Sequence, residues 1–310
     1  MAITLLEASK QVKGEVFRSA VIEMFASTHD ILTALPYIDI AGGSYNYLQE
    51  GELPGVSFRG LNEAITTTTG ILNPQVEHLK IVSSQLDVDN ALLKMTSNDV
   101  RDTHERQHIK AHALNVADKI INGDSLNDPR EFDGLRVRIK GSQLIPANLG
   151  APAANSPLSL EALDKAIDEV KNPTHLIMDV AMRRKLTQAA KTPSVAGDLR
   201  FEKDDFGRRV GFYNDLPILL SDENNLGQRI IDFNEAGPAG GTTSTSIYVV
   251  SLMQDKVVGL QNGIMEAEDR GKIDDGNVLR TYFEWITGLA VLDGRSCSRV
   301  WGITNATVTA

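Results

Sequence analysis

The sequence predicts an α+β fold made of an N-terminal arm, a long β-hairpin, one long helix, and a region of mixed helix and strand. Two observations predict this fold class. Threonine-rich extended runs separated by turn residues precede a single capped helix, and shorter helical and strand-like segments then follow one another to the C-terminus. The chain has 310 residues, 42% of them hydrophobic, so it can bury a substantial core, and its length suggests about two domains.

Residues 1–40 are expected to form an arm that contains helix. Apolar residues recur at roughly helical spacing from Leu5 to Phe25, although Gly14 weakens the middle of this segment. The arm is expected to end near Pro36.

Residues 41–89 are predicted to form a long two-stranded hairpin. Its strand-like runs cover Val56–Thr69 and Gln75–Val88, with glycine and Asn-Pro turn residues between them. The four consecutive threonines of the first run favour extended backbone because β-branching restricts side chains in a helix. Isolated two-stranded ribbons are marginally stable in water, so we expect this hairpin to lie on another surface, most simply a neighbouring subunit.

The longest helix is predicted at 97–122. It begins with the capping residue types Ser97, Asn98 and Asp99, and it ends at Asn122-Gly123. Two faces could pack against neighbours: Val100, His104, His108, Ala111, Leu114 and Ile121 lie on one, and Ile109, Ala113, Val116 and Ile120 on the other. A helix with two such faces is expected to lie between other elements as a spine.

A connector rich in Ala, Pro, Asn and Gly, at 147–157, leads into the mixed region. A helix is expected from Ser159 to the stop at Asn172-Pro173, and a mobile loop at 235–246. The remaining expected elements are a helix at Ala181–Ala190 and strands at Leu135–Ile139, His175–Met178, Leu216–Leu220, Ile230–Phe233, Ile247–Leu252, Val278–Ile286 and Ser298–Thr304.

Composition excludes several function classes. A net charge of −10, without a run of five basic residues, argues against affinity built on neutralising phosphates, although an acidic wall would suit packed nucleic acid. Cys297 is the only cysteine, so intramolecular disulfides and cysteine-based zinc sites are excluded, and a packed thiol is expected. Glu7 and Lys10 interrupt the position of a secretory signal, and no stretch approaches the about 20 apolar residues of a membrane span. We expect a cytosol-like compartment and no membrane partner.

The sharpest chemical motif is His-Glu-Arg-Gln-His, residues 104–108. On a helix, His104 and His108 could bind zinc while Glu105 polarises a bound water, with His112 in the same spacing and Glu131 as a conceivable third ligand.

Two features oppose a metal site. An arginine stands inside the motif, and no glycine precedes His112 as in the extended three-histidine pattern. Stacked histidines also suit a polar seam between packed helices, which needs no metal. Phosphate loops, dinucleotide fingerprints and nucleophile elbows are absent from the sequence. We therefore assign no catalytic, cofactor-binding or metal residue.

The order of these parts resembles the major capsid proteins of tailed bacteriophages, over essentially the whole chain. The residues that carry the resemblance are the helix end and the segment after it, Ile120–Asp124 and Asp128–Leu135, and two strand-like segments, Val257–Gly263 and Trp285–Val291.

The resemblance implies an N-terminal arm (1–40), an extension loop (41–89), a peripheral domain (90–140 plus 257–310) with spine helix 97–122, and an axial domain (141–256). The loop at 235–246 would then lie near the centres of pentamers and hexamers. The implied function is an icosahedral shell around double-stranded DNA in the virion, assembled in the cytoplasm of a bacterial host, with a portal as a further partner.

Two departures from relatives matter. The predicted spine helix begins near Ser97 and leaves only a short arm, so assembly is expected to need a separate scaffolding protein. The sequence has no lysine between Lys13 and Lys80, so we expect no covalent cross-link from the tip of the extension loop. Charged loop residues, Glu50, Glu52, Arg59 and Glu63, are candidates for pairing across subunits instead.

Three functions remain open from the sequence. The first is a viral capsid subunit, the second an encapsulin-like nanocompartment of the same fold, and the third a zinc hydrolase that uses His104, Glu105 and His108. Particle size and metal content separate the third from the other two.

Overall fold

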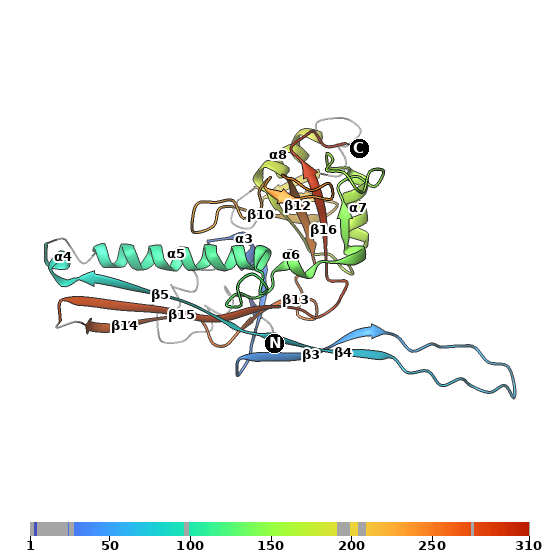
Figure 1. The fold of residues 1–310 in the computed structure, drawn as a ribbon, viewed down its shortest axis with the longest axis horizontal. Helices are drawn as coiled ribbons and strands as arrows, with labels where there is room; N and C mark the ends of the chain where they lie inside the picture. The colour runs from blue at the N-terminus through green and yellow to red at the C-terminus, as the bar shows by residue number, and fades with distance from the viewer. Residues whose placement is uncertain are drawn as a thin grey trace.

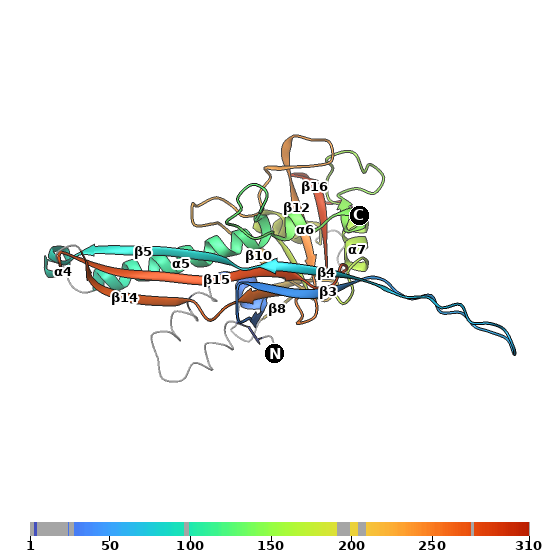
Figure 2. The same cartoon turned by 60° about the horizontal axis from the view of Figure 1, so that its bottom comes forward.

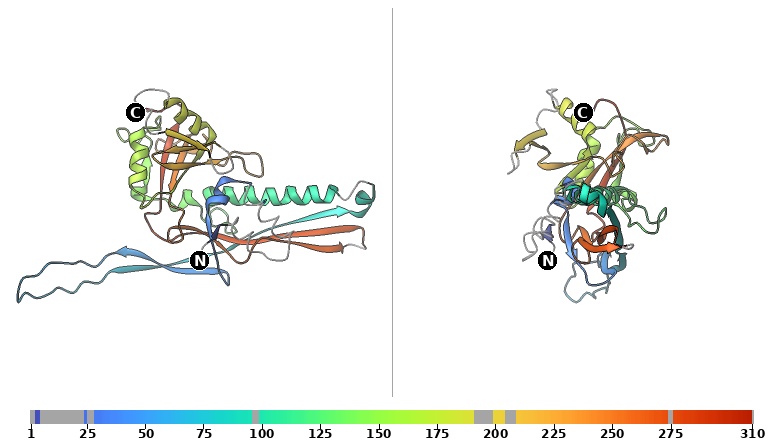
Figure 3. Two further views of the ribbon diagram at one scale, coloured as in Figure 1. Left: turned by 180° about the vertical axis from the view of Figure 1, so that it is seen from behind. Right: turned by 90° about the vertical axis from the view of Figure 1, so that its left-hand side faces the viewer.

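The computed structural model describes residues 3–4, 24, 28–95, 99–190, 199–203, 209–273 and 276–309. Figure 1 shows an elongated lower layer, in which a long helix lies along a sheet, and a compact upper part built around a second sheet. A two-stranded hairpin projects from the lower layer on the side away from the long helix (Figures 2 and 3).

The projecting hairpin consists of β3 (Ser44–Glu52), β4 (Ile71–His78) and the connecting residues 53–70. Among the described strands, β3 and β4 pair only with each other. The expected strand at Val56–Thr69 is wrong, because branched side chains favour extended backbone but a strand also needs a hydrogen-bonded partner, and residues 53–70 form no ladder. The run expected at Gln75–Val88 divides at the buried Leu79, and its second part is β5 (Lys80–Asp89).

The lower layer is a six-stranded sheet. Strand β15 (Val278–Val291) pairs with β5 along one edge, and with β13 (Val257–Gln261) and β14 (Glu266–Ile273) along the other. Two short strands of the arm, β1 (Ile3–Thr4) and β2 (Pro36–Asp39), extend the sheet beyond β13. The helix expected between Leu5 and Phe25 falls largely outside the described residues. The short helix α4 (Asn90–Met95) follows β5.

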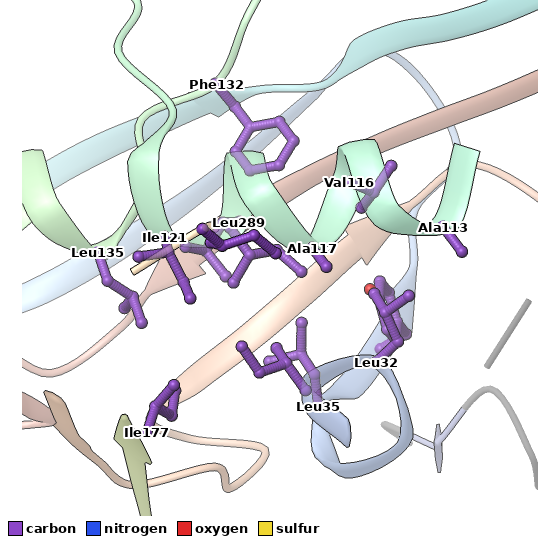
Figure 4. Close-up of a cluster of buried hydrophobic side chains, with 14 of the residues drawn as sticks. Leu32, Leu35, Ala113, Val116, Ala117, Ile121, Phe132, Leu135, Ile177 and Leu289 are labelled. Carbon is purple, nitrogen blue, oxygen red and sulfur yellow. The ribbon is translucent and has the colours of Figure 1, made fainter. Parts of the chain in front are cut away.

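The spine helix is confirmed as α5, Asp99–Asn122. Its C-terminal half is apolar where it meets the sheet and the arm, and Ala113, Ala117 and Ile121 belong to the same buried cluster as Leu32 and Leu35, on or next to α3 (Asp30–Ala34) (Figure 4). The helix therefore packs against the sheet and α3, whereas His104 of the first expected face is exposed.

The end of α5 is packed so closely against the next segment that two glycines are required. A Cβ on Gly123 would overlap the carbonyl oxygens of Phe132 and Lys119. A Cβ on Gly134 would lie 2.7 Å from the carbonyl oxygen of Ile121. The Gly134 amide also donates to the Gly123 carbonyl (2.9 Å), which locks the crossing.

Replacing Gly123 with alanine is expected to lower the free energy of unfolding by about 1–3 kcal/mol, because backbone must move to admit the methyl group. Chemical denaturation of the unassembled chain measures this. Gly43→Ala is the control, since nothing lies within 4 Å of a Cβ at that exposed position. Equal stability of the two variants would contradict the prediction.

The upper part contains an eight-stranded sheet. Its order is β6 (Leu144–Pro146), β16 (Cys297–Thr304), β12 (Thr242–Val250), β7 (His175–Asp179), β10 (Leu216–Ser221), β9 (Arg209–Tyr213) and β8 (Leu199–Lys203), with β11 (Glu235–Ala236) paired to β12. Helices α7 (Leu160–Asp168) and α8 (Val180–Ala189) contribute to its core. Strand β16 thus pairs within this sheet, although the resemblance placed residues 257–310 in the peripheral domain.

Two further strands expected from the sequence are wrong. Leu135–Ile139 alternates like a strand, but α6 (Leu135–Arg138) is one helical turn that buries Leu135 against the core cluster, followed by the 3-10 turn Gly141–Gln143. At Ile230–Phe233 the two isoleucines are buried in an irregular segment without a ladder. The loop expected at 235–246 is shorter, because β11 and β12 use both of its ends.

Candidate functional site

The histidine motif on α5 does not gather into a metal site. His104 is exposed, whereas Glu105 accepts hydrogen bonds from Arg101 Nε (3.0 Å) and Thr281 Oγ1 (2.7 Å) on β15. His108 turns to the sheet, where its ring stacks on Phe283 with 5.6 Å between centroids. The Glu105 carboxylate would have to activate a water in a metal site. It instead joins α5 to β15.

The proposed third ligand also lies elsewhere. Glu131 forms an ion pair with Lys119 (2.6 Å), eleven residues beyond His108 and so about 16 Å along the helix axis. Within the described residues, no group of three or more His, Cys, Asp or Glu side chains could hold a metal ion.

The histidines instead form a polar seam between the middle of α5 and strand β5, and not between packed helices as expected. The Ser84 hydroxyl lies 2.6 Å from His112 Nε2 and 3.2 Å from His108 Nδ1. A hydroxyl has one proton, so it donates to one ring and accepts from the other, which suits two neutral histidines. Burial lowers the pKa of His112 to about 4 and also lowers the pKa of His108.

This seam predicts loss of stability in acid. The folded pKa of His112 lies below its ordinary value of 6.5, so the unfolded chain binds more protons as pH falls. The stabilisation is complete above pH 6.5 and is lost as pH falls toward about 4. Denaturation of the unassembled chain as a function of pH should show a shallower decline for His112→Leu than for the wild type.

The control for that measurement is His78→Gln, which removes an exposed histidine of the projecting hairpin. It should keep the wild-type slope between pH 6.5 and 4. A His112→Leu slope equal to that of the wild type would contradict the seam as the source of acid sensitivity.

The projecting hairpin presents a large apolar surface to solvent. Val56 is 94% exposed, Leu61 is 98% exposed and Phe58 is fully exposed. The other exposed large hydrophobic residues of the hairpin are Leu48, Leu53, Ile65, Ile71, Leu72 and Val76. Monomeric proteins rarely expose contiguous apolar patches of this kind, which mark interaction surfaces.

The hairpin tip is ordered by its own polar groups. The Gly60 amide donates to Glu63 Oε2 (2.7 Å), and Arg59 Nη1 donates to the Glu63 carbonyl (3.1 Å). Thr68 Oγ1 donates to the Gly55 carbonyl (2.6 Å) across the two arms of the loop. Two of the charged residues expected to pair across subunits, Arg59 and Glu63, thus make contacts within the tip.

The base of the hairpin is attached by three side chains that we call the hairpin clamp: Arg138, Glu77 and Tyr47. The Arg138 guanidinium forms two parallel bonds to the Glu77 carboxylate (2.5 and 2.8 Å). The Tyr47 hydroxyl donates to the Val291 carbonyl (3.0 Å). Burial and the neighbouring Glu77 raise the pKa of Tyr47 to about 12, so this hydroxyl remains a donor.

Sequence reasoning missed the clamp. Arg138 was assigned to a strand, and Glu77 stands 61 residues away from it in the chain. Nothing in the local pattern of either residue signals their pairing.

A buried ion pair fixes β11 to the centre of the upper sheet. Arg299 Nη2 lies 2.6 Å from Glu235 Oε2, with side chains only 7% and 3% exposed. The Ser246 hydroxyl accepts from Arg299 Nε (2.9 Å) and donates to Glu235. Cys297, the first residue of β16, is buried, and burial raises the pKa of its thiol to about 12, so the expectation of a packed thiol is confirmed.

Asn155 links two loops of the upper part. Its side-chain nitrogen donates to the Gly240 carbonyl (3.1 Å), and its side-chain oxygen accepts from the Ala239 amide (3.3 Å). It joins the connector at 147–157 to the 237–241 turn, and neither segment contains a charged residue.

Across the described residues, no helix is both long enough and apolar enough to span a membrane.

Comparisons with known proteins find similarity to capsid and encapsulin shells. A model of the family Major capsid protein GP7 matches residues 13–151. No curated relative matches the sequence. Among solved structures, the SrpI encapsulin complex of Synechococcus elongatus PCC 7942 is 16% identical, with 100% of this chain and 99% of that chain covered and a TM-score of 0.69.

Two capsids are also similar. The capsid of a native GTA particle is 12% identical, with coverage of 95% and 93% and a TM-score of 0.63. The capsid of Ralstonia phage GP4 is 12% identical, with coverage of 88% and 87% and a TM-score of 0.57. The resemblance to tailed-phage major capsid proteins is therefore confirmed, and this chain has the shell fold that those proteins share with encapsulins.

Proposed function

We propose that this chain is the major capsid protein of a tailed phage, and that it assembles through pentamers and hexamers into an icosahedral shell around double-stranded DNA. The observation that carries the proposal is the projecting hairpin, whose large apolar side chains have no partner surface within the described part of the chain. A second copy supplies such a surface, and the family match supports a phage capsid.

The parts of the chain have distinct roles in this proposal. The lower sheet and α5 form the peripheral domain, and the eight-stranded sheet, including β16, forms the axial domain. The uncharged segments joined by Asn155 lie near capsomer centres, where copies approach without charge repulsion. A scaffolding protein and a portal are further partners, and the acidic chain contacts packaged DNA without sequence preference.

Electron microscopy of the purified chain tests the proposal, with and without a candidate scaffolding protein, together with metal analysis of the same sample. Uniform shells or capsomer rings without stoichiometric zinc are expected. A monodisperse monomer or dimer in both samples would refute it.

The similarity to an encapsulin over the full chain favours a second candidate, a cellular nanocompartment. The contents of the particle distinguish the two: double-stranded DNA is expected for the capsid and a protein cargo for the nanocompartment.

We assign no enzymatic role. The zinc-hydrolase hypothesis requires a water-activating Glu105, whose carboxylate instead bonds Arg101 and Thr281. Particles should be indifferent to chelators, and one bound zinc per chain with chelator-sensitive hydrolysis would restore that hypothesis.

A further inference from the structure

We propose that the hairpin clamp sets the direction in which the projecting hairpin leaves the body, and that this direction determines the curvature at which copies join. The link to curvature rests on the proposed function, whereas the effect on the direction of the hairpin does not. It concerns Arg138, Glu77 and Tyr47, and it assigns them a positioning role, since the apolar contacts of the tip supply the affinity.

The junction of the hairpin with the body, at Gly43 and Leu79, can act as a hinge. Its two strands enter and leave the body side by side, where the Leu79 amide donates to the Gly43 carbonyl (3.0 Å) and Leu79 is buried in a small apolar cluster. A ribbon held only at such a point can swing. A second attachment away from the hinge is needed to fix its direction.

The clamp is that second attachment. Every residue of β4 is exposed except Glu77, which stands two residues from the hinge. On β3, the Tyr47 hydroxyl bonds Val291 at the end of β15, and Tyr45 stacks on Tyr47 with 5.9 Å between ring centroids. The Gln49 side chain of β3 also lies close to Gly294, and beyond it the described hairpin runs clear of the body (Figures 1 and 3).

Arg138 is itself held rigidly. Its Nε donates to the Asp133 carbonyl (2.8 Å), and its Nη2 donates to the Leu289 carbonyl (3.0 Å) as well as to Glu77. All three guanidinium nitrogens are thus engaged, and the Arg138 and Glu77 side chains are only 15% and 19% exposed. A planar, bidentate pair of this kind fixes angle as well as distance.

A small displacement at the clamp causes a larger displacement at the far end of the hairpin. At about 3.3 Å per strand residue, Glu77 lies about 7 Å from the hinge and the far end of β4 about 26 Å from it. A displacement of about 1 Å at the clamp therefore moves the end of the strand by about 4 Å, and the tip by more. Loss of the clamp should thus change where the tip meets the next copy and leave the tip itself intact.

The first test uses the unassembled full-length chain. Spin labels at Thr67→Cys in the tip and Glu161→Cys on α7 give the tip-to-body distance distribution by pulsed electron paramagnetic resonance; the native Cys297 is buried. Glu77→Gln should broaden the distribution at least twofold. Tyr47→Phe, which removes a single hydroxyl, should broaden the distance distribution less. This milder variant still tests the clamp if Glu77→Gln fails to fold.

The matched control is Asp87→Asn. Asp87 and Arg280 form a bidentate pair on the same lower sheet (both bonds 2.6 Å), away from the hairpin. This variant should keep the wild-type distribution. Equal widths for Glu77→Gln, Tyr47→Phe and Asp87→Asn would overturn the clamp.

The second test measures particle diameters by electron microscopy. Glu77→Gln should still assemble, but with at least a threefold larger fraction of particles outside the wild-type diameter, while Asp87→Asn matches the wild type. Unchanged diameters for Glu77→Gln would overturn the link to curvature. Absence of shells from the wild type under all conditions would refute the proposed function, whereas the distance measurement would still decide the clamp.

Discussion

Replacing Phe58 and Leu61 together with serine is expected to leave the chain folded and to prevent shell formation. Both side chains are almost fully exposed in the single chain, so folding does not depend on their burial. Full burial of a Phe or Leu side chain contributes about 1.5–3 kcal/mol, so the pair contributes about 3–6 kcal/mol to each contact between copies. The concentration required for assembly should rise at least 100-fold.

Sedimentation and electron microscopy across a concentration series measure this effect. Leu226→Ser is the matched control, because Leu226 is also exposed but lies in a loop of the upper part, away from the hairpin. This control should assemble at the wild-type concentration. Normal shells from the Phe58→Ser/Leu61→Ser variant would show that the tip is not the main apolar contact.

Replacing Arg299 with methionine is expected to lower the free energy of unfolding by about 3–5 kcal/mol. The change leaves the buried Glu235 carboxylate without its cation, and an uncompensated buried charge is strongly destabilising. Chemical denaturation should be followed in the Phe58→Ser/Leu61→Ser background, so that unfolding is not coupled to assembly.

Two further variants separate charge from packing. Removing both charges, with Arg299→Met and Glu235→Leu, should recover part of the loss, because no charge is then left buried alone. Asp87→Asn breaks a much more exposed pair, so a much smaller loss of stability is expected. An Arg299→Met effect as small as that of Asp87→Asn would contradict the prediction.

Elements with strong local signals were predicted well. The spine helix has capping residues, helical spacing and a terminal glycine within one segment, and it appears as α5. The strands β7, β10 and β15 are short or alternating apolar runs next to turn residues, and they lie close to the expected positions. In each case the information needed lies within a few residues of the element.

Errors arose where a local pattern fits two structures. Leu135–Ile139 alternates like a strand, yet the Gly123–Gly134 crossing places Leu135 against the core, where one helical turn suffices. The threonine-rich run has high strand propensity but no partner strand among the described residues. Propensity describes the backbone of a residue, whereas pairing depends on what the rest of the fold places beside it.

The histidine motif is another local pattern that fits two structures. The spacing of His104, His108 and His112 could serve a metal or a polar seam, and the sequence favoured the seam without identifying its partners. Those partners, Ser84 and Phe283, come from strands far away along the chain.

Composition, periodicity and local caps were enough to predict the fold class, the order of the parts and the spine helix, and the order of parts with a few short segments carried the resemblance to capsid subunits. The hairpin clamp, the pairing of β16 in the upper sheet and the buried Arg299–Glu235 pair depend instead on contacts between distant segments. Glu77 and Arg138 are 61 residues apart, and Glu235 and Arg299 are 64 apart. Such contacts form when packing brings distant segments together, and no periodicity within either segment encodes them.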